Sequence, residues 1–286
     1  MKRYRDIAGD GGSNIVGQVE AQQARLGARL REVGAIVAVV SGKGGVGKSS
    51  ITANLAGAFA LAGARVGVLD ADLNGPSMAT MLGVRGRTLL VGADGVEPPA
   101  GALGIRVMSM DLLLAGDATP LTWDAPTQAD AHTWRGTMEA NALREFLADT
   151  AWGVLDLLLI DLPPGTDRLA TIVGLVPALA GTVIVTIPSD VSRLVVRKSI
   201  TVAQAAPAPV LGVIENMAGV FPGVGAEAMA HDSGVPFLGR VPFDPALAAA
   251  ADRGEPYVAA APAAAAARAL TAIADSLSET LRPAGS

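Results

Sequence analysis

The sequence has 286 residues, of which 50% are hydrophobic, and it carries a formal net charge of −5 and no cysteine. This composition predicts one large α/β domain with a well-buried core. It excludes disulfides, thiolate zinc sites and cysteine-ligated iron–sulfur clusters from this chain. The N-terminal residues are polar, and the longest mostly apolar stretch, 172–187, is too short for a bilayer span. We therefore expect a soluble cytoplasmic protein.

The N-terminal part of the chain alternates between helical periodicity and short apolar runs. Residues 1–12 are expected to be disordered, and apolar positions at helical spacing predict a helix over 14–33. A continuous apolar run over 36–40 predicts a buried parallel strand. A helix over 48–61 and a strand over 65–70 follow it, and together they make a strand–loop–helix–strand unit.

The same alternation continues to the end of the chain. Strands are predicted over 105–110, 155–161, 182–187, 210–214 and 237–241, and helices over 137–150, 190–205, 225–232 and 246–251. Residues 83–104 fit a hairpin or loop, 115–133 a long surface insertion, and the alanine-rich stretch 257–281 a covering helix. The pattern predicts a doubly wound, mainly parallel β-sheet with helices on both faces.

A glycine-rich loop follows the strand over 36–40. The segment Gly42-Lys-Gly-Gly-Val-Gly-Lys-Ser49 matches G-x-x-x-x-G-K-[ST]. Its glycines let backbone N–H groups point at phosphate oxygens, Lys48 is expected to reach the β- and γ-phosphates, and Ser49 is expected to bind Mg²⁺. The sequence therefore predicts a P-loop that binds ATP with Mg²⁺. The residues expected to contact the nucleotide are Gly42, Lys43, Gly44, Gly45, Val46, Gly47, Lys48, Ser49 and Ser50.

This loop sets the expected domain organisation. We divide the chain into an N-terminal tail and helix over 1–33 and a single P-loop ATPase domain over 34–286. The expected surface insertion at 115–133 lies within that domain.

Acidic residues close two of the predicted strands, at the edge where open parallel sheets bind ligands. Asp161 ends an apolar strand in the manner of a Walker B motif and is expected to hold Mg²⁺ through water. Asp72 is expected to orient the attacking water, and the N–H of Gly165 to sense the γ-phosphate. For Asp70 the sequence leaves two roles open, a structural cap of the strand and a contact to a metal-bound water. The predicted metal-site residues are Ser49, Asp72 and Asp161, and the predicted catalytic residues are Lys43, Lys48 and Asp72.

Lys43 makes the loop more specific. The segment Lys43-Gly-Gly-Val-Gly-Lys-Ser49 resembles the deviant Walker A motif of the MinD/ParA ATPases, in which the first lysine crosses a dimer interface to the partner's nucleotide. A second cation beside the phosphates can offset charge that develops during phosphoryl transfer. The resemblance implies a homodimer in which Lys43 acts in trans, and the alternative is a solvated lysine on a loop.

The wider sequence resembles the Mrp/ApbC family, the iron–sulfur carrier branch of the MinD-like ATPases. The blocks that carry this resemblance are Ser41–Ser50, Leu69–Ser77, Trp134–Met138, Ile160–Thr166, Val210–Met217 and Gly234–Gly239. The resemblance implies that Asn216 lies near the adenine, where an amide suits both N6 and N7. It also implies that Pro242 and Asp244 belong to a second loop that contacts the base.

The chain departs from that family after Asn216. Family members usually continue with an aromatic stretch and Cys-x-x-Cys, whose thiolates hold a cluster between two subunits, whereas residues 217–224 contain no cysteine. The segment 167–171 also departs from the family's usual pattern. We therefore expect the ATPase module without a cysteine-bound iron–sulfur cluster of its own.

Two classes of function follow from these motifs. The first is a dimeric ATP-dependent switch in metallocofactor or protein assembly and delivery, which acts with an unidentified client protein. The second is a MinD/ParA-like spatial regulator on membrane or DNA, which needs a basic amphipathic tail or a basic surface. Residues 276–286 carry one arginine and the net charge is negative, so we favour the first class and expect no nucleic-acid or membrane partner. A third class is a partner-regulated subunit that binds ATP and hydrolyses it poorly.

Overall fold

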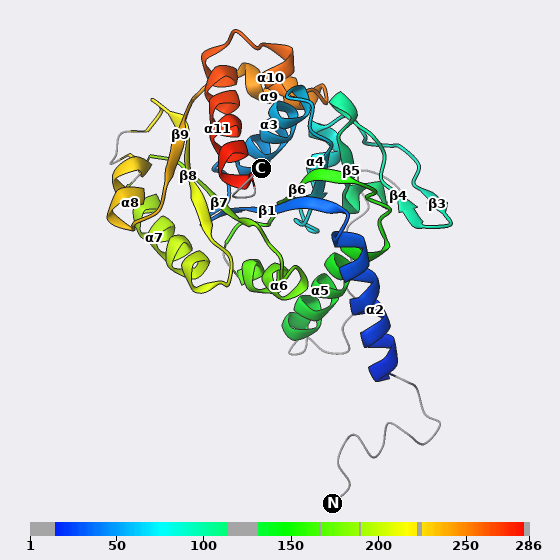
Figure 1. Cartoon of the computed structure of the whole chain (residues 1–286). Helices are drawn as coiled ribbons and strands as arrows, with labels where there is room; N and C mark the ends of the chain where they lie inside the picture. The colour runs from blue at the N-terminus through cyan, green and yellow to red at the C-terminus, as the bar shows by residue number, and fades with distance from the viewer. Residues whose placement is uncertain (1–14, 114–130, 166, 189, 222–224, 283–286) are drawn as a thin grey trace, which may run out of the picture.

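A central parallel sheet organises the chain (Figure 1). The computed structural model describes residues 15–113, 131–165, 167–188, 190–221 and 225–282. The seven strands are β1 (Val33–Ser41), β2 (Val66–Asp70), β5 (Arg106–Met108), β6 (Leu155–Asp161), β7 (Gly181–Thr186), β8 (Val210–Ala218) and β9 (Phe237–Pro242). Their order is β5-β2-β6-β1-β7-β8-β9, and all neighbouring strands are parallel. The predicted doubly wound parallel sheet is confirmed.

Helices cover both faces of this sheet (Figure 1). The upper layer consists of α3 (Lys48–Leu61), α4 (Met78–Met81), α9 (Ala246–Asp252), α10 (Tyr257–Ala260) and α11 (Ala265–Leu281). The lower layer consists of α2 (Ile15–Leu30), α5 (Ala131–Asp149), α6 (Asp167–Leu175), α7 (Asp190–Ala205) and α8 (Ala226–Asp232). Two covered faces explain why β1 and β7 are buried at nearly every position instead of at alternate positions.

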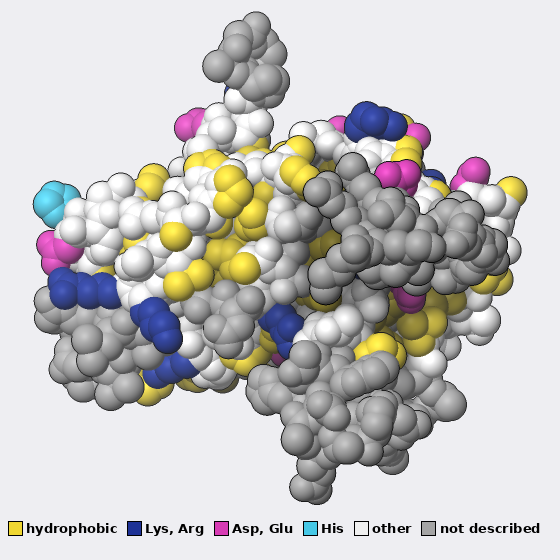
Figure 2. Space-filling model, turned by 90° about the horizontal axis from the view of Figure 1, so that it is seen from below, with side chains coloured by type: hydrophobic (Ala, Val, Ile, Leu, Met, Phe, Trp, Pro, Cys, Tyr) yellow, Lys and Arg dark blue, Asp and Glu magenta, His cyan; other side chains and the backbone are white. Residues whose placement is uncertain are grey.

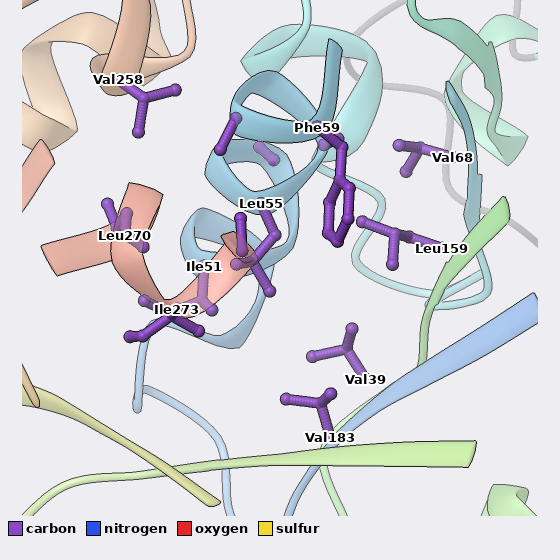
Figure 3. Packing of buried hydrophobic residues seen from close by; sticks show 14 of the residues in the cluster. Val39, Ile51, Leu55, Phe59, Val68, Leu159, Val183, Val258, Leu270 and Ile273 are labelled. Atoms are coloured by element: carbon purple, nitrogen blue, oxygen red, sulfur yellow. The ribbon is translucent and has the colours of Figure 1, made fainter. Parts of the chain in front are cut away.

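Helix α3 is the centre of the upper core. Figure 3 shows Ile51, Leu55 and Phe59 of α3 between the sheet and α11, and the first two side chains are fully buried. Each buried side chain of this size stabilises the fold by about 1.5–3 kcal/mol. This packing fixes the helix that follows the P-loop, so the position of the loop relative to the sheet is fixed as well.

The lower layer of helices contains a hollow. Figure 2 shows hydrophobic side chains gathered on this face. A hollow of about 580 Å³ lies between α2, the start of β1 and the segment after α6, and Leu26, Leu30 and Leu175 are among the residues that line it. Leu26 is buried in the core of this layer, so α2 packs on the domain that follows it.

Several predicted elements differ from the observed ones. Helix α6 was not predicted, and α5 begins at Ala131, so the last residues of the expected insertion 115–133 are helical. The rest of that insertion and the expected disordered tail 1–12 lie outside the described residues. The segment 83–104 contains a hairpin of β3 (Leu90–Gly92) and β4 (Gly95–Glu97) and the 3-10 turn η1 (Ala102–Gly104).

Two strands also have different ends from the predicted ones. Strand β5 stops at Met108, because Ser109 accepts a hydrogen bond from the N–H of Asp111 and starts the 3-10 turn η2 (Met110–Leu112). Strand β8 continues to Ala218, past its predicted end at residue 214. No helix within the described ranges combines the length and apolar character that crossing a bilayer requires.

Candidate nucleotide-binding site

The P-loop connects β1, in the middle of the sheet, to α3. Gly45 and Gly47 both have a φ of 78°, a conformation that residues with a Cβ rarely adopt. Gly47 also lies so close to Asn216 that an added Cβ would stand 2.3 Å from the amide nitrogen. Both glycines are therefore required by the shape of the loop. The loop borders a cavity of about 280 Å³ lined by Ser41, Lys43, Gly44, Gly45, Val46, Gly47, Lys48, Ser49, Ser50, Asp72, Ser77, Met81 and Pro164.

The floor of this site is a buried ion pair. The ammonium of Lys48 lies 2.7 Å from Oδ2 of Asp161, and the two side chains are 6% and 0% exposed. Ser49 donates its hydroxyl to the same carboxylate oxygen over 2.6 Å. Residues 112 positions apart in the sequence thus meet at the carboxyl ends of β1 and β6. The two P-loop residues and the acid predicted to hold phosphate and Mg²⁺ are brought together.

Thr52 is a site residue that the sequence reasoning missed. Its hydroxyl donates to Oδ1 of Asp161 over 2.7 Å, so both oxygens of this carboxylate have partners. The sequence contains a pattern that identifies Thr52, because residues three apart on a helix share a face and Thr52 follows Ser49 by three positions. Thr52 holds the acid in place beside the two P-loop side chains.

Asp70 makes structural contacts, the first of the two roles that the sequence leaves open. Its carboxylate is fully buried at the end of β2 and accepts hydrogen bonds from the N–H groups of Ser77 and Met78, at 2.8 and 2.9 Å, and from the Ser109 hydroxyl. Burial, together with the neighbouring Asp161, raises the pKa of Asp70 to about 7, and this shift is already reduced by the two N–H groups and by Lys48. Asp70 therefore anchors the segment that leads into α4.

Asp72 borders the cavity directly. The N–H of Gly75 donates to its Oδ1 over 3.1 Å and to its carbonyl over 3.3 Å, which closes a turn over residues 72–75. The carboxylate therefore sits at the first position of an ordered turn beside the P-loop. Its predicted roles toward water and metal stay predictions.

Gly165 lies on the opposite side of the P-loop. Its N–H, predicted to sense the γ-phosphate, donates to the carbonyl of Ser41 over 2.9 Å. Its φ of 96° again favours glycine. The preceding Pro164 lines the cavity. In this structure the N–H of Gly165 is therefore hydrogen-bonded to the end of β1.

The residues assigned to the base side make internal contacts. Asn216 is buried and donates from Nδ2 to the carbonyl of Val46 over 2.9 Å, so its amide supports the P-loop. Asp244 accepts from the hydroxyl of Tyr257 at 2.5 Å and from the N–H of Ala246 at 3.0 Å. Pro242 is the last residue of β9. None of these three lines the cavity beside the P-loop, and their contact with adenine stays a prediction.

The oxygen donors at the P-loop fit Mg²⁺. This ion prefers oxygen ligands and usually combines one or two carboxylates with water and substrate phosphates. The Ser49 hydroxyl and the Asp161 carboxylate, already 2.6 Å apart, supply that kind of ligand set. Within the described ranges, no cluster of three or more His, Cys, Asp or Glu side chains is arranged to hold a metal.

Known sequences show similarity over most of the chain. A family model described as ParA, NUBPL iron-transfer P-loop NTPase, matches residues 32–278. An iron–sulfur cluster carrier protein of Saccharolobus solfataricus is 44% identical over 252 residues, which cover 84% of this chain and 81% of that protein. A cytosolic Fe-S cluster assembly factor of Eremothecium gossypii is 41% identical over 239 residues, which cover 76% of this chain and 80% of that protein.

Solved structures show the same fold. A nucleotide-binding protein of Archaeoglobus fulgidus in complex with ADP is 36% identical, with a TM-score of 0.67 and coverage of 82% of this chain and 92% of that one. The cell division ATPase MinD of Pyrococcus furiosus is 25% identical, with a TM-score of 0.63 and coverage of 86% and 99%. The family match extends from β1 to α11 and so includes the P-loop, the acidic strand ends and the β8–β9 edge.

Proposed function

This chain belongs to the ParA family of NUBPL-type iron-transfer P-loop NTPases, and on that premise we propose that it is a dimeric ATPase acting as a switch in metallocofactor assembly or delivery. The family membership agrees with the Mrp/ApbC resemblance of the sequence. The observation that carries the proposal is the buried cluster of Lys48, Ser49 and Asp161 at the floor of the P-loop cavity. We assign the ATPase activity to one domain over residues 34–286.

Binding of ATP begins with an exchange of partners at Lys48. In the ligand-free site its ammonium neutralises Asp161. The triphosphate offers a more highly charged partner, so Lys48 turns to the β- and γ-phosphates and leaves the Asp161 carboxylate and the Ser49 hydroxyl to the Mg²⁺ that accompanies ATP. When bound there, Mg²⁺ neutralises charge on the β- and γ-phosphate oxygens. The P-loop N–H groups bind the remaining phosphate oxygens.

Hydrolysis requires a water in line with the γ-phosphate. Asp72 lines the same cavity and accepts a hydrogen bond from that water, which orients it for attack. The water oxygen bonds to the γ-phosphorus as the bond to the β–γ bridging oxygen breaks, the water's proton passes to the phosphate product, and ADP and phosphate leave. The N–H of Gly165 donates a hydrogen bond to the carbonyl of Ser41 in this structure. While ATP is bound, it donates to the γ-phosphate instead, and after phosphate release it donates to Ser41 again. The segment around Gly165 thereby reports which nucleotide is present.

Lys43 completes the site in a partner subunit. It borders the cavity on the outer part of the loop, while Lys48 occupies the floor. In a two-fold symmetric dimer each Lys43 reaches the nucleotide of the other protomer and offsets charge that develops in the transition state. ATP then favours the dimer, and hydrolysis releases it.

The cargo side of the proposal rests on the relatives. Proteins at 41–44% identity are described as an iron–sulfur cluster carrier and a cytosolic Fe-S cluster assembly factor. This chain has no cysteine, so it would act on a metallocofactor or its client protein in the cytosol without holding a cluster through thiolates. The MinD structure supports the spatial-regulator alternative, but it is less similar, at 25% identity.

Mixing two inactive variants tests the shared site. Lys43→Ala and Asp72→Ala should each lower kcat at least about 100-fold. A mixed dimer has one intact site, formed by Asp72 of the first variant and Lys43 of the second. Mixing equal amounts should restore about a quarter of the parent activity, because half of the dimers are mixed and each has one working site.

The control is the Lys43→Ala/Asp72→Ala double variant mixed with Asp72→Ala, which contains no intact site. Tagged subunits report whether mixed dimers form. If mixed dimers form in the first mixture and activity does not recover, Lys43 does not act in trans. If the parent itself hydrolyses no ATP, the ATPase proposal is wrong.

A further inference from the structure

A further buried acid, besides Asp161 and Asp70, contacts the turn beside the nucleotide site and has no role in the proposed ATPase chemistry. Glu139 on α5 is 4% exposed. Burying a carboxylate costs several kcal/mol unless it is paired and hydrogen-bonded. The partners of Glu139 therefore identify what this acid does.

One oxygen of Glu139 binds the turn that begins with Asp72. The amide of Asn74 donates from Nδ2 to Oε1 of Glu139 over 3.0 Å. Asn74 lies inside the 72–75 turn, which the N–H of Gly75 closes onto Asp72. Glu139 therefore contacts the segment that positions the proposed catalytic acid.

The other oxygen of Glu139 binds the segment that follows β6. Oε2 forms an ion pair with the guanidinium of Arg168 in the first turn of α6. Arg168 lies three residues after Gly165, whose N–H donates to Ser41 in this structure. Glu139 therefore contacts, through Arg168, the start of the helix that follows the predicted γ-phosphate sensor.

We propose that Glu139 is a positioning residue that couples these two segments, so that the Asp72 turn takes up its working position only when the Gly165 segment has engaged the γ-phosphate. This inference rests on the proposed function, in which Gly165 senses that phosphate. The coupling is strong because neither segment can move away alone without leaving a buried carboxylate partly unpaired. Glu139 is not among the residues that line the P-loop cavity, so its effect on the nucleotide is indirect.

The first test is amide hydrogen exchange with and without Mg²⁺ and a non-hydrolysable ATP analogue. In the parent, the analogue should slow exchange in the P-loop and in the 72–75 turn. In Arg168→Met, the P-loop should still respond, whereas the slowing in the 72–75 turn should fall about fivefold, the lower end of usual couplings between sites. Glu139→Gln, which keeps an acceptor for Asn74 but loses the charge, should show the same loss, and Arg168→Lys should restore part of the response.

Steady-state kinetics give a second readout. Arg168→Met should lower kcat and leave KM for ATP within about twofold, because the P-loop contacts are unchanged and only the placement of Asp72 suffers. A purely structural role would lower thermal stability without this split between kcat and KM.

The matched control is Arg240→Met. It removes the partner of Glu215, another buried acid, whose side chain is 4% exposed beside an Arg240 that is 48% exposed. This variant should lose stability and keep the full response of the 72–75 turn. Equal slowing of that turn in Arg168→Met and the parent overturns the inference and leaves the proposed function intact. A parent whose segments do not respond to the analogue overturns the proposed function, and the inference with it.

Discussion

The carboxyl ends of β1, β2 and β6 and those of β8 and β9 lie along the same edge of the sheet, yet their polar side chains are used differently. In the first group, Lys48 and Asp161 pair with each other at the floor of a cavity. In the second group, Asn216 holds the backbone of the P-loop and Asp244 holds Tyr257. The predicted phosphate side consists of charges that a ligand can take over, whereas the predicted base side consists of hydrogen bonds that stabilise the fold.

The difference lies in what the polar groups of each region are paired with. The ion pair at Lys48 keeps the phosphate groove in shape, because a buried charge that loses its partner is costly. On the base side, the Nδ2–Val46 hydrogen bond of Asn216 already satisfies part of the amide. If Asn216 contacts adenine, as predicted, its amide nitrogen must leave Val46, just as Lys48 must leave Asp161 when it meets phosphate.

The largest effect is expected on the phosphate side. Lys48→Ala removes the cation that meets the β- and γ-phosphates and should weaken Mg-ATP binding more than about 100-fold by calorimetry, equivalent to about 3 kcal/mol. It should also lower thermal stability, because Asp161 then stays buried without its cation. Lys198→Ala, at an exposed lysine on α7, is the control and should change neither quantity. If Lys48→Ala folds and binds ATP as tightly as the parent, the charge at the P-loop does not bind the phosphates, and the two regions do not differ as described.

An intermediate effect is expected on the base side. Asn216→Ala removes one buried hydrogen bond to the P-loop and should weaken ATP binding about tenfold, the equivalent of about 1.4 kcal/mol. Because that contact supports the loop itself, inorganic tripolyphosphate should lose the same factor. A loss confined to ATP would contradict this expectation and favour the adenine contact that the family resemblance implies. Asp244→Asn should change both affinities by less than about twofold.

The smallest effect is expected at the amino end of β6, away from both regions. Hydrogen bonds from Arg65 lower the pKa of Asp156 to about 2, below its ordinary value of 3.8. A carboxyl whose pKa is lower in the folded state stabilises the fold above about pH 4 and loses this contribution as the pH falls from about 4 to 2. The pair is exposed, so Asp156→Asn should cost less than about 1 kcal/mol of unfolding free energy near pH 6.

Urea unfolding of the parent and of Asp156→Asn across this pH range provides the measurement. The difference between the two proteins should shrink toward zero as the pH approaches 2, while ATP affinity at neutral pH stays equal. A constant difference at every pH would show that the ion pair is not its source.

The sequence predicted the fold and the phosphate side because their signals are local. The P-loop is a contiguous motif, and helix α3 has the predicted bounds Lys48–Leu61. Helix α6 was missed because it is short and its apolar end is separated from β7 by only five residues, so helix and strand share one mostly apolar stretch over 172–187. Hydrophobic periodicity over so short a window does not separate the end of a helix from the start of the next strand.

The contacts that the sequence did not reveal join distant segments. Asn74 and Glu139 are 65 positions apart, and Asn216 and Val46 are 170 positions apart. Nothing in the composition around Glu139 distinguishes it from an acid on the exposed face of a helix. Only the packing of α5 beneath the sheet buries it, and burial is what turns an ordinary glutamate into a residue that must be paired.

The strand order has a consequence for the chain as it leaves the ribosome. Strands β1 and β2 are made early but are not neighbours, because β6 lies between them, and the other side of β1 pairs with β7. A nascent chain that ends before residue 155 therefore exposes two apolar strands with open edges, a state that favours aggregation. Asp161 arrives with β6, so nucleotide can help the nascent chain to fold only after the middle of the sheet has closed.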